Sequence, residues 1–180
     1  MDGTKIVGAN GQRRKLDFYP TPPEVTQALV EYLNLPAGSV IWEPAEGAGH
    51  IVRVLQQNGY TVIGSDIQTG TDFLTAAAPP VFDWIITNPP FSLSVEFINR
   101  CVDLGRPFAL LLKSQYWHSA RRQPLFDKTR PAAVLPLTWR PDFTGQGNSL
   151  MDMCWVIWDA EPAQITSYLP LVKPIEEGDK

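Results

Sequence analysis

The chain has 180 residues, of which 17 are Pro and 13 are Gly. This share of turn-forming residues favours many short elements, and the length fits one folded unit with a sizeable core. The apolar content of 44% and the charged content of 19% exclude disordered, collagen-like and coiled-coil classes. No apolar run approaches the ~20 residues of a membrane helix, so we expect no membrane partner.

The net charge of −4 excludes a protein that coats nucleic acid indiscriminately, but it permits a local basic patch. The N-terminus lacks the apolar segment of a secretion signal, so we expect a cytoplasmic protein. Cys101 and Cys154 lie in apolar segments without CxxC or His-Cys spacing. We therefore expect two buried, reduced thiols and no metal site.

The two ends of the chain are expected to differ from the body. Residues 1–16 are polar and basic and predict a mobile arm, and residues 173–180 predict a charged tail. The body, residues 17–172, is expected to form a single domain. Thr21 is followed by prolines and by Glu24, which predicts a helix over about 22–34 with Thr21 as its N-cap.

Strand and helix patterns then alternate along the middle of the chain. Buried strands are predicted around residues 40–42, 61–64, 83–87 and 108–112, and helices around 51–59 and from Ser92 to about 104, where Gly105 ends the second. Continuous apolar strands separated by amphipathic helices indicate a doubly wound α/β domain, with a mostly parallel sheet covered by helices on both faces.

The last third departs from this alternation. Residues 116–131 predict a loop and a short helix, in which we expect His118 to be a surface residue. Strands are predicted at about 132–138 and 151–158, on either side of a Gly-rich loop. Two strands joined in this way predict an antiparallel hairpin at the edge of the sheet.

Ligands of open α/β sheets bind beyond the carboxyl ends of the strands, where three segments of this chain are informative. The first is residues 43–49, Glu-Pro-Ala-Glu-Gly-Ala-Gly, whose glycines permit a tight turn and a close approach of a ligand. Val52 replaces the third glycine of a dinucleotide-binding loop, and carboxylates would repel a pyrophosphate. The loop therefore suits a cationic ligand, although an ordinary strand-to-helix turn is the alternative.

The second segment begins at Asp66, at the end of the next strand. A carboxylate at this place accepts hydrogen bonds from both hydroxyls of a ribose, and the alternative is a turn or helix cap. Asp72 and Phe73 follow, and together they suit the amino group and the face of an adenine. The alternative for this pair is a loop aspartate beside a core phenylalanine.

The third segment, residues 88–91, is Asn-Pro-Pro-Phe. Because prolines keep the chain extended and lack N–H groups, the segment presents the Asn88 amide oxygen and bare carbonyls beside an aromatic ring. Such an array suits a planar amine, with two acceptors for its hydrogens and Phe91 stacked on its ring.

In the order of these motifs the chain resembles the class I S-adenosylmethionine-dependent methyltransferases, and among them the amino-group enzymes with an Asn/Asp-Pro-Pro-aromatic motif. The resemblance extends from about residue 17 to 159 and implies a Rossmann-like catalytic domain. The part from Phe108 to Trp117, with the segments around Arg121 and Arg140, is similar to small phage and prophage adenine DNA methyltransferases.

The resemblance implies roles for individual residues. The catalytic residues would be Asn88, Pro89, Pro90 and Phe91. The cofactor S-adenosyl-L-methionine would be bound by Tyr19, Thr21, Glu43, Ala45, Gly47, Gly49, Asp66, Ile67, Asp72, Phe73 and Asn88. The nucleic acid would be bound by Phe91, Tyr116, Trp117, Arg121, Arg122 and Arg140, and Tyr116 and Trp117 could instead pack a loop onto the sheet.

The expected function is methylation of the exocyclic amino group of adenine in DNA, by a monomer or a homodimer. Alternatives are methylation of adenine or guanine in RNA, methylation of a protein glutamine amide, and a non-catalytic cofactor-binding subunit. Members that recognise a DNA sequence usually carry a separate recognition region, whereas only residues 114–150 are available here. We therefore expect weak or very short sequence specificity.

Overall fold

The computed structural model describes residues 19–145, 147 and 151–175. The predicted basic arm, residues 17 and 18, and the last residues of the predicted tail, 176–180, lie outside this range. No helix of the described residues is long and apolar enough to cross a membrane.

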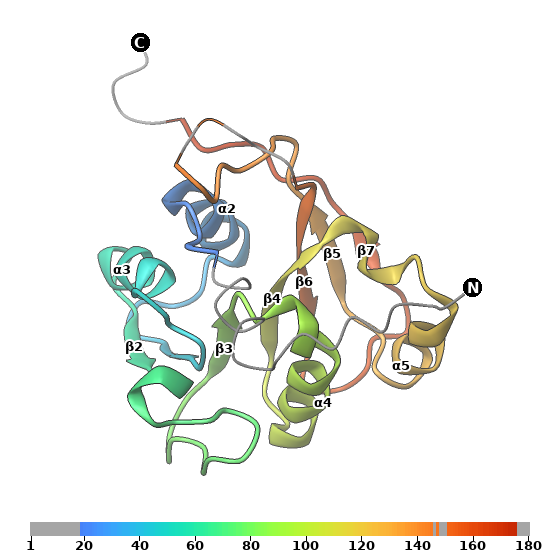
Figure 1. Cartoon of the computed structure of the whole chain (residues 1–180), viewed down its shortest axis with the longest axis horizontal. Coiled ribbons are helices and arrows are strands. Elements are labelled where there is room, and N and C mark those ends of the chain that lie inside the picture. The colour runs from blue at the N-terminus through green and yellow to red at the C-terminus, as the bar shows by residue number, and fades with distance from the viewer. Residues whose placement is uncertain (1–18, 146, 148–150, 176–180) are drawn as a thin grey trace, which may run out of the picture.

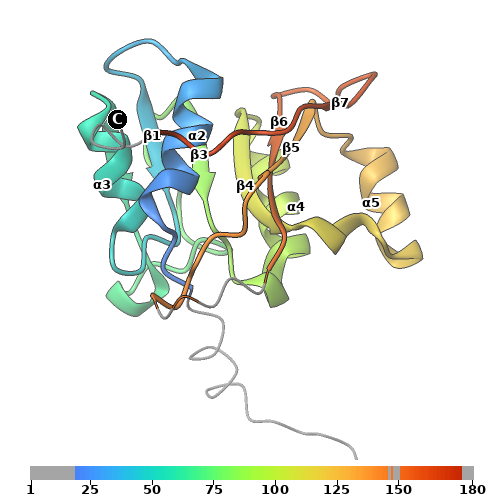
Figure 2. The ribbon, with the colours of Figure 1, turned by 90° about the horizontal axis from the view of Figure 1, so that it is seen from above.

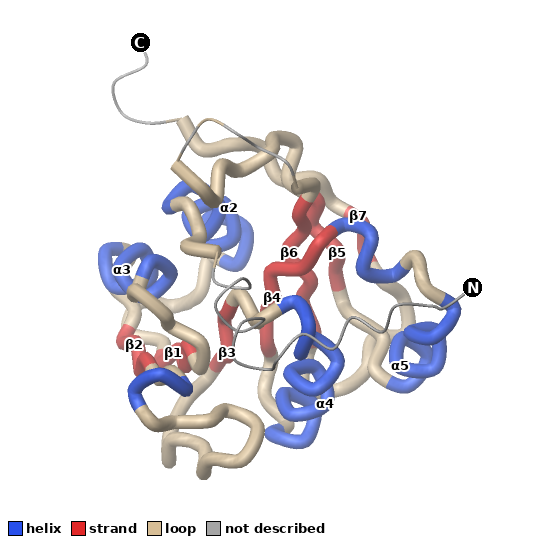
Figure 3. Tube along the Cα trace, viewed as in Figure 1, coloured by secondary structure: helices blue, strands red, loops and turns tan. Residues whose placement is uncertain are grey.

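The described residues form a seven-stranded sheet in the order β2-β1-β3-β4-β6-β5-β7, which Figure 3 shows from left to right. The first four strands are parallel, β6 is antiparallel to β4 and to β5, and β7 is parallel to β5. The strands are β1 (Val40–Glu43), β2 (Thr61–Gly64), β3 (Trp84–Thr87), β4 (Phe108–Lys113), β5 (Ala133–Pro136), β6 (Met153–Trp158) and β7 (Ser167–Tyr168). The predicted α/β class with a mostly parallel sheet is confirmed.

The helices cover both faces of the sheet, with α2 and α3 on one side and α4 on the other (Figure 1). Viewed from above, α5 lies at the opposite end of the molecule from α3 (Figure 2). The α-helices are α2 (Pro23–Leu33), α3 (His50–Gln57), α4 (Ser94–Leu104) and α5 (Gln123–Lys128). Short 3-10 turns are η1 (Ile67–Thr69), η2 (Phe91–Leu93), η3 (Ser114–Trp117) and η4 (Ala120–Arg122).

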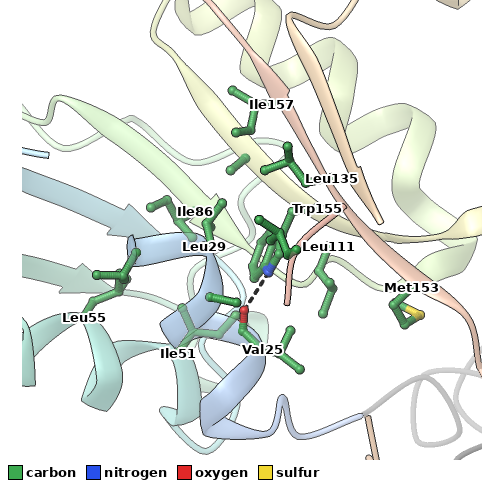
Figure 4. Packing of buried hydrophobic residues seen from close by; sticks show 14 of the residues in the cluster. Val25, Leu29, Ile51, Leu55, Ile86, Leu111, Leu135, Met153, Trp155 and Ile157 are labelled. Atoms are coloured by element: carbon green, nitrogen blue, oxygen red, sulfur yellow. Dashed lines mark hydrogen bonds between the residues drawn. The ribbon is translucent and has the colours of Figure 1, made fainter. Parts of the chain in front are cut away.

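Two aromatic and aliphatic cores separate the helices from the sheet. Val25 and Leu29 of α2 pack on strand residues such as Trp155, whose indole Nε1 donates a hydrogen bond to the Val25 carbonyl at 2.8 Å (Figure 4). On the other face Phe97 and Ile98 of α4 pack against the remaining strand side chains. Successive side chains along a strand point to opposite faces of the sheet, so they belong alternately to the two cores. This is expected for a sheet that has helices on both faces.

The two predicted strands of the last third, β5 and β6, form an antiparallel pair, as predicted, but this pair does not lie at the edge of the sheet. The edge next to them is formed by β7, and β6 lies between β4 and β5. The sequence did not indicate β7, because Ser167 and Tyr168 are both exposed and carry no apolar pattern.

Two predicted helix starts are wrong. Pro22, which has no side-chain donor or acceptor, is the N-cap of α2, and the hydroxyl of Thr21 is hydrogen-bonded to Asn88 instead. Ser92 lies inside η2, so α4 begins two residues later at Ser94. The predicted end of α4 at Gly105 is confirmed, with a left-handed φ of 62°. Both cysteines are buried and free, as predicted.

Candidate active site

A cleft of about 780 Å³ opens beyond the carboxyl ends of β1, β2 and β3. Its walls come from the segments that follow these strands, from the chain that enters α2 and from the start of α4. The lining residues are Tyr19, Pro20, Thr21, Pro44, Ala45, Glu46, Gly47, Ala48, His50, Ile51, Asp66, Ile67, Gln68, Asp72, Phe73, Leu74, Asn88, Pro90, Ser92, Leu93 and Phe97. The fold thus brings together in one cleft the three segments that the sequence indicated.

The glycine loop after β1 is held against the end of β2. Gly47 and Gly49 have φ values of 51° and 73°, in the left-handed region that favours glycine. The Gly47 N–H donates to Asp66 Oδ2 at 3.0 Å, and the Glu46 N–H donates to the Ser65 carbonyl at 3.1 Å. Gly47 and Ala45 line the cleft, whereas Gly49 does not and forms the N-cap of α3.

Asp66 organises this corner of the cleft. Its second oxygen, Oδ1, accepts from the Gln68 N–H at 2.7 Å, so each carboxylate oxygen holds one backbone N–H. A carboxylate has about four lone-pair sites, and two therefore remain for a ligand. Ile67 is 47% exposed beside it and lines the cleft, which supplies an apolar surface next to the acid.

Asp72 and Phe73 lie in the same cleft. Asp72 Oδ1 accepts from the Leu74 N–H at 3.0 Å. Phe73 is buried, with its ring 5.1 Å from that of Trp42 and 4.8 Å from that of Phe97, centroid to centroid. Phe73 is therefore a core residue that also forms part of the cleft wall.

Asn88 is fixed in orientation at the end of β3. Its Nδ2 donates to the Tyr19 carbonyl at 3.1 Å and to Thr21 Oγ1 at 3.0 Å. Because a carbonyl oxygen only accepts, the amide nitrogen must face Tyr19, and Oδ1 faces away from both partners. Pro90 lines the cleft beside Asn88, whereas Pro89 is buried and does not.

The ring of Phe91 lies beside the cleft rather than among its lining residues. It stacks on Tyr19 with centroids 5.5 Å apart and an interplanar angle of 30°. The ammonium of Lys113, at the end of β4, lies 4.5 Å from the Phe91 centroid. Lys113 was not singled out from the sequence, because nothing along the chain relates it to residue 91.

Glu43 is placed differently from Glu46, although both belong to the glycine loop. Glu43 is fully buried and does not line the cleft. Burial raises the pKa of Glu43 to about 8, although the hydrogen bond that Glu43 accepts from the Ala45 N–H opposes the shift. The Ala45 N–H is hydrogen-bonded to Oε1 at 2.9 Å, but Oε2 and the Thr87 hydroxyl have no hydrogen-bond partner among the described residues.

Of the two acids in the glycine loop, Glu46 is the one that lines the cleft, although the sequence did not single it out. Its carboxylate lies where a side chain at Gly64 would otherwise be, so the missing Cβ makes room for it. A possible signal was the glycine that ends β2, a position where strands usually carry a larger residue. His50 also lines the cleft unpredicted, and burial together with the Arg53 guanidinium lowers the pKa of His50.

The aromatic pair after β4 does not line the cleft. Tyr116 is buried, and its ring meets that of Trp117 edge-on at 4.8 Å. Trp117 in turn contacts Phe126 of α5 and Trp158 of β6. This placement matches the alternative reading, in which the pair packs a loop onto the sheet.

The arginines expected to contact nucleic acid have different surroundings. Arg122 donates to the Tyr116 carbonyl and lies 4.2 Å from the Tyr116 ring centroid. Arg140 forms an ion pair with Asp152 at 2.7 Å, in which both side chains are more than half exposed. Arg121 and His118 are exposed, as expected for His118. No cluster of three or more potential metal ligands occurs among the described residues.

No family model matches the chain, and no curated protein matches its sequence. Solved structures with a similar fold include three of low sequence identity. The first, from Listeria monocytogenes and assigned to the class I S-adenosylmethionine-dependent methyltransferases, has a TM-score of 0.61 and 13% identity over 87% of this chain and 67% of its own.

The second is the modification subunit of a protein assigned as a type I restriction enzyme from Vibrio vulnificus, with a TM-score of 0.56, 14% identity and coverage of 91% of this chain. The chain spans only 48% of that subunit. The third, assigned as an RNA methyltransferase from Pyrococcus horikoshii, has a TM-score of 0.53, 13% identity and coverage of 86% and 93%. The chain therefore has the Rossmann-like fold of class I methyltransferases.

Proposed function

We propose that the chain is an S-adenosylmethionine-dependent N-methyltransferase that acts on the exocyclic amino group of adenine in DNA. The observation that carries the proposal is the orientation of Asn88. Its Nδ2 is held by Tyr19 and Thr21, so its Oδ1 is presented as an acceptor beside a cleft large enough for a nucleoside cofactor.

The cleft suits this cofactor in charge and shape. S-adenosylmethionine is a nucleoside with cationic groups, and it supplies an electrophilic methyl group. Asp66, with two open lone-pair sites, would accept from the ribose hydroxyls, and Ile67 and Phe73 would enclose the adenine. Glu46 adds negative charge where a cationic ligand would lie.

An aryl amine is a poor nucleophile because its lone pair is delocalised into the ring, and Asn88 would counteract this delocalisation. A hydrogen bond from the amine to Asn88 Oδ1, with a second to a backbone carbonyl of the proline pair, favours a tetrahedral nitrogen with a localised lone pair. The orientation of the amine toward the methyl group then supplies most of the rate enhancement. A general base with a strongly shifted pKa is not required.

Two observations support a nucleic acid acceptor. The Asn-Pro-Pro-Phe segment combines acceptors with an aromatic ring, as a base flipped from its stack requires. Of the structures with a similar fold, one is named as the modification subunit of a type I restriction enzyme and another as an RNA methyltransferase. Because these include an RNA methyltransferase, the acceptor is tested with DNA and RNA side by side.

The experiment incubates the purified chain and labelled cofactor with DNA and, in parallel, with RNA, and then digests each nucleic acid to nucleosides. We expect methylated adenine with the wild type and a loss of transfer in Asn88→Ala, with cofactor binding by calorimetry retained. Asn58→Ala is the matched control, because Asn58 Nδ2 also bonds two neighbours, Gln27 and Val54, outside the cleft. Methylated RNA in place of DNA would change the acceptor, and unimpaired transfer by Asn88→Ala would remove Asn88 from the mechanism.

A further inference from the structure

Lys113 is the last residue of β4 and lies near the proposed acceptor site. β3 and β4 are adjacent parallel strands (Figure 3), and Thr87 pairs with Leu110. Lys113 is three residues beyond Leu110, so it projects from the same edge of the sheet as Asn88 and the residues that follow it. Its ammonium lies 4.5 Å from the centroid of the Phe91 ring.

Tyr19 and Lys113 both contact the ring of Phe91, but they differ in how firmly they are held. Tyr19 stacks on the ring, while its carbonyl accepts from Asn88 Nδ2 and its own ring meets the buried Phe143 edge-on at 6.2 Å. Tyr19 is therefore held from several sides. Lys113 carries its charge on a flexible four-carbon stem and is only half-buried, so it is the neighbour that can leave.

The ammonium of Lys113 has no hydrogen bond or ion pair with an oxygen among the described residues; the π face of Phe91 is the partner that the structure gives it. Other cations of the same region are engaged elsewhere. Arg122 bonds the Tyr116 carbonyl, Arg130 bonds the Gln164 carbonyl, and Arg140 pairs with Asp152. An aromatic ring holds a cation less specifically than a carboxylate or phosphate does.

From this geometry, and resting on the proposed function, we infer that Lys113 is a placeholder that covers Phe91 until an acceptor base arrives. The incoming base takes the place of the ammonium against the ring. The released ammonium then contacts a phosphate of the same strand, where its charge is better matched. Lys113 is thus a positioning and affinity residue that couples base entry to a backbone contact.

Binding of two ligands, an oligonucleotide and adenosine, distinguishes this role of Lys113 from a purely structural one. Lys113→Met keeps an unbranched apolar side chain but removes the charge, and Lys173→Met is the control, because Lys173 is an exposed lysine beyond β7. Binding of an adenine-containing oligonucleotide is measured by titration at several salt concentrations. Binding of adenosine, which has no phosphate, is measured with the same proteins.

For Lys113→Met we expect the slope of log K against log salt for the oligonucleotide to become shallower by about 0.7 to 0.9, the value of one phosphate contact, and its affinity at 0.1 M salt to fall about five- to eightfold. Adenosine should bind at least as tightly as to the wild type, because its competitor for Phe91 is gone. Lys173→Met should match the wild type with both ligands.

An unchanged salt slope, or a parallel loss of affinity for both ligands, would overturn the inference. A failure of the placeholder role can be distinguished from a failure of the proposed function, because the proposed function is judged by methyl transfer with the wild type. If the wild type transfers no methyl group, the proposed function fails; if it transfers and Lys113→Met shows the wild-type slope, the placeholder role alone fails.

Discussion

Thr21→Val is the substitution that most sharply isolates how Asn88 is positioned. It removes the oxygen that accepts from Asn88 Nδ2 at 3.0 Å and keeps the shape of a side chain that is 3% exposed. Asn88 Nδ2 retains its bond to the Tyr19 carbonyl, but one of its hydrogens is left without a partner in a partly buried place. A buried donor left unpaired costs about 1–3 kcal/mol, so we expect the free energy of unfolding to fall by about 1–2 kcal/mol.

The same loss allows the Asn88 amide to rotate, so its Oδ1 is no longer held toward the acceptor. Since 1.4 kcal/mol corresponds to a factor of about ten in rate, we expect methyl transfer at saturating cofactor to fall roughly tenfold. Urea unfolding and single-turnover transfer are the two assays, and calorimetry shows whether cofactor affinity also changes.

Thr26→Val is the matched control. Thr26 is also buried, one turn into α2, but its hydroxyl has no hydrogen-bond partner among the described residues. Replacing it should leave stability unchanged or raise it, and transfer should be unaffected. Equal behaviour of Thr21→Val and Thr26→Val in both assays would show that the Thr21 hydroxyl does not orient Asn88.

Two further predictions concern the acids of the glycine loop. Glu43 holds a proton in the folded chain up to about pH 8 but in the unfolded chain only up to its ordinary pKa of 4.5, so its contribution to stability is complete below pH 4.5 and is lost as the pH rises to 8. The free energy of unfolding of the wild type should therefore fall between pH 5 and 8, by at most about 1.4 kcal/mol per pH unit, and Glu43→Gln should lack this contribution when both are unfolded in urea. The same pH dependence in both proteins would contradict a raised pKa of Glu43. Gly64→Ala adds a Cβ that collides with the Glu46 carboxylate, so cofactor affinity should fall about tenfold with little change in stability. In a Glu46→Ala background Gly64→Ala should have almost no effect, and additive losses would show that it acts by another route.

Much of the fold followed from local patterns. Strand β4 is a continuous run of buried apolar residues from Phe108 to Leu112, and Gly105 ends α4 because it adopts a left-handed conformation. β7 could not be predicted, because its two exposed residues are held in place by hydrogen bonds to β5 and not by their own burial. Strand order between β4, β6 and β5 is likewise a matter of tertiary pairing.

The lining of the cleft was predictable where a residue follows directly on the end of a strand, as for Asp66 and Asn88. A contact of the site was not predictable where it joins two residues that are distant in the sequence. Thr21 has the pattern of a helix cap, yet its hydroxyl bonds Asn88, 67 residues away. Lys113 meets Phe91 only because β3 and β4 are neighbours.

The most direct test of the central claim is a mass-spectrometric count of methylated adenine in DNA from cells that express the chain. Cells with the wild type should contain N-methylated adenine well above cells with Asn88→Ala, while cells with Asn58→Ala should match the wild type. Equal counts in wild-type and Asn88→Ala cells, with both proteins folded and able to bind the cofactor, would contradict the claim that Asn88 presents its oxygen to an adenine amine of DNA.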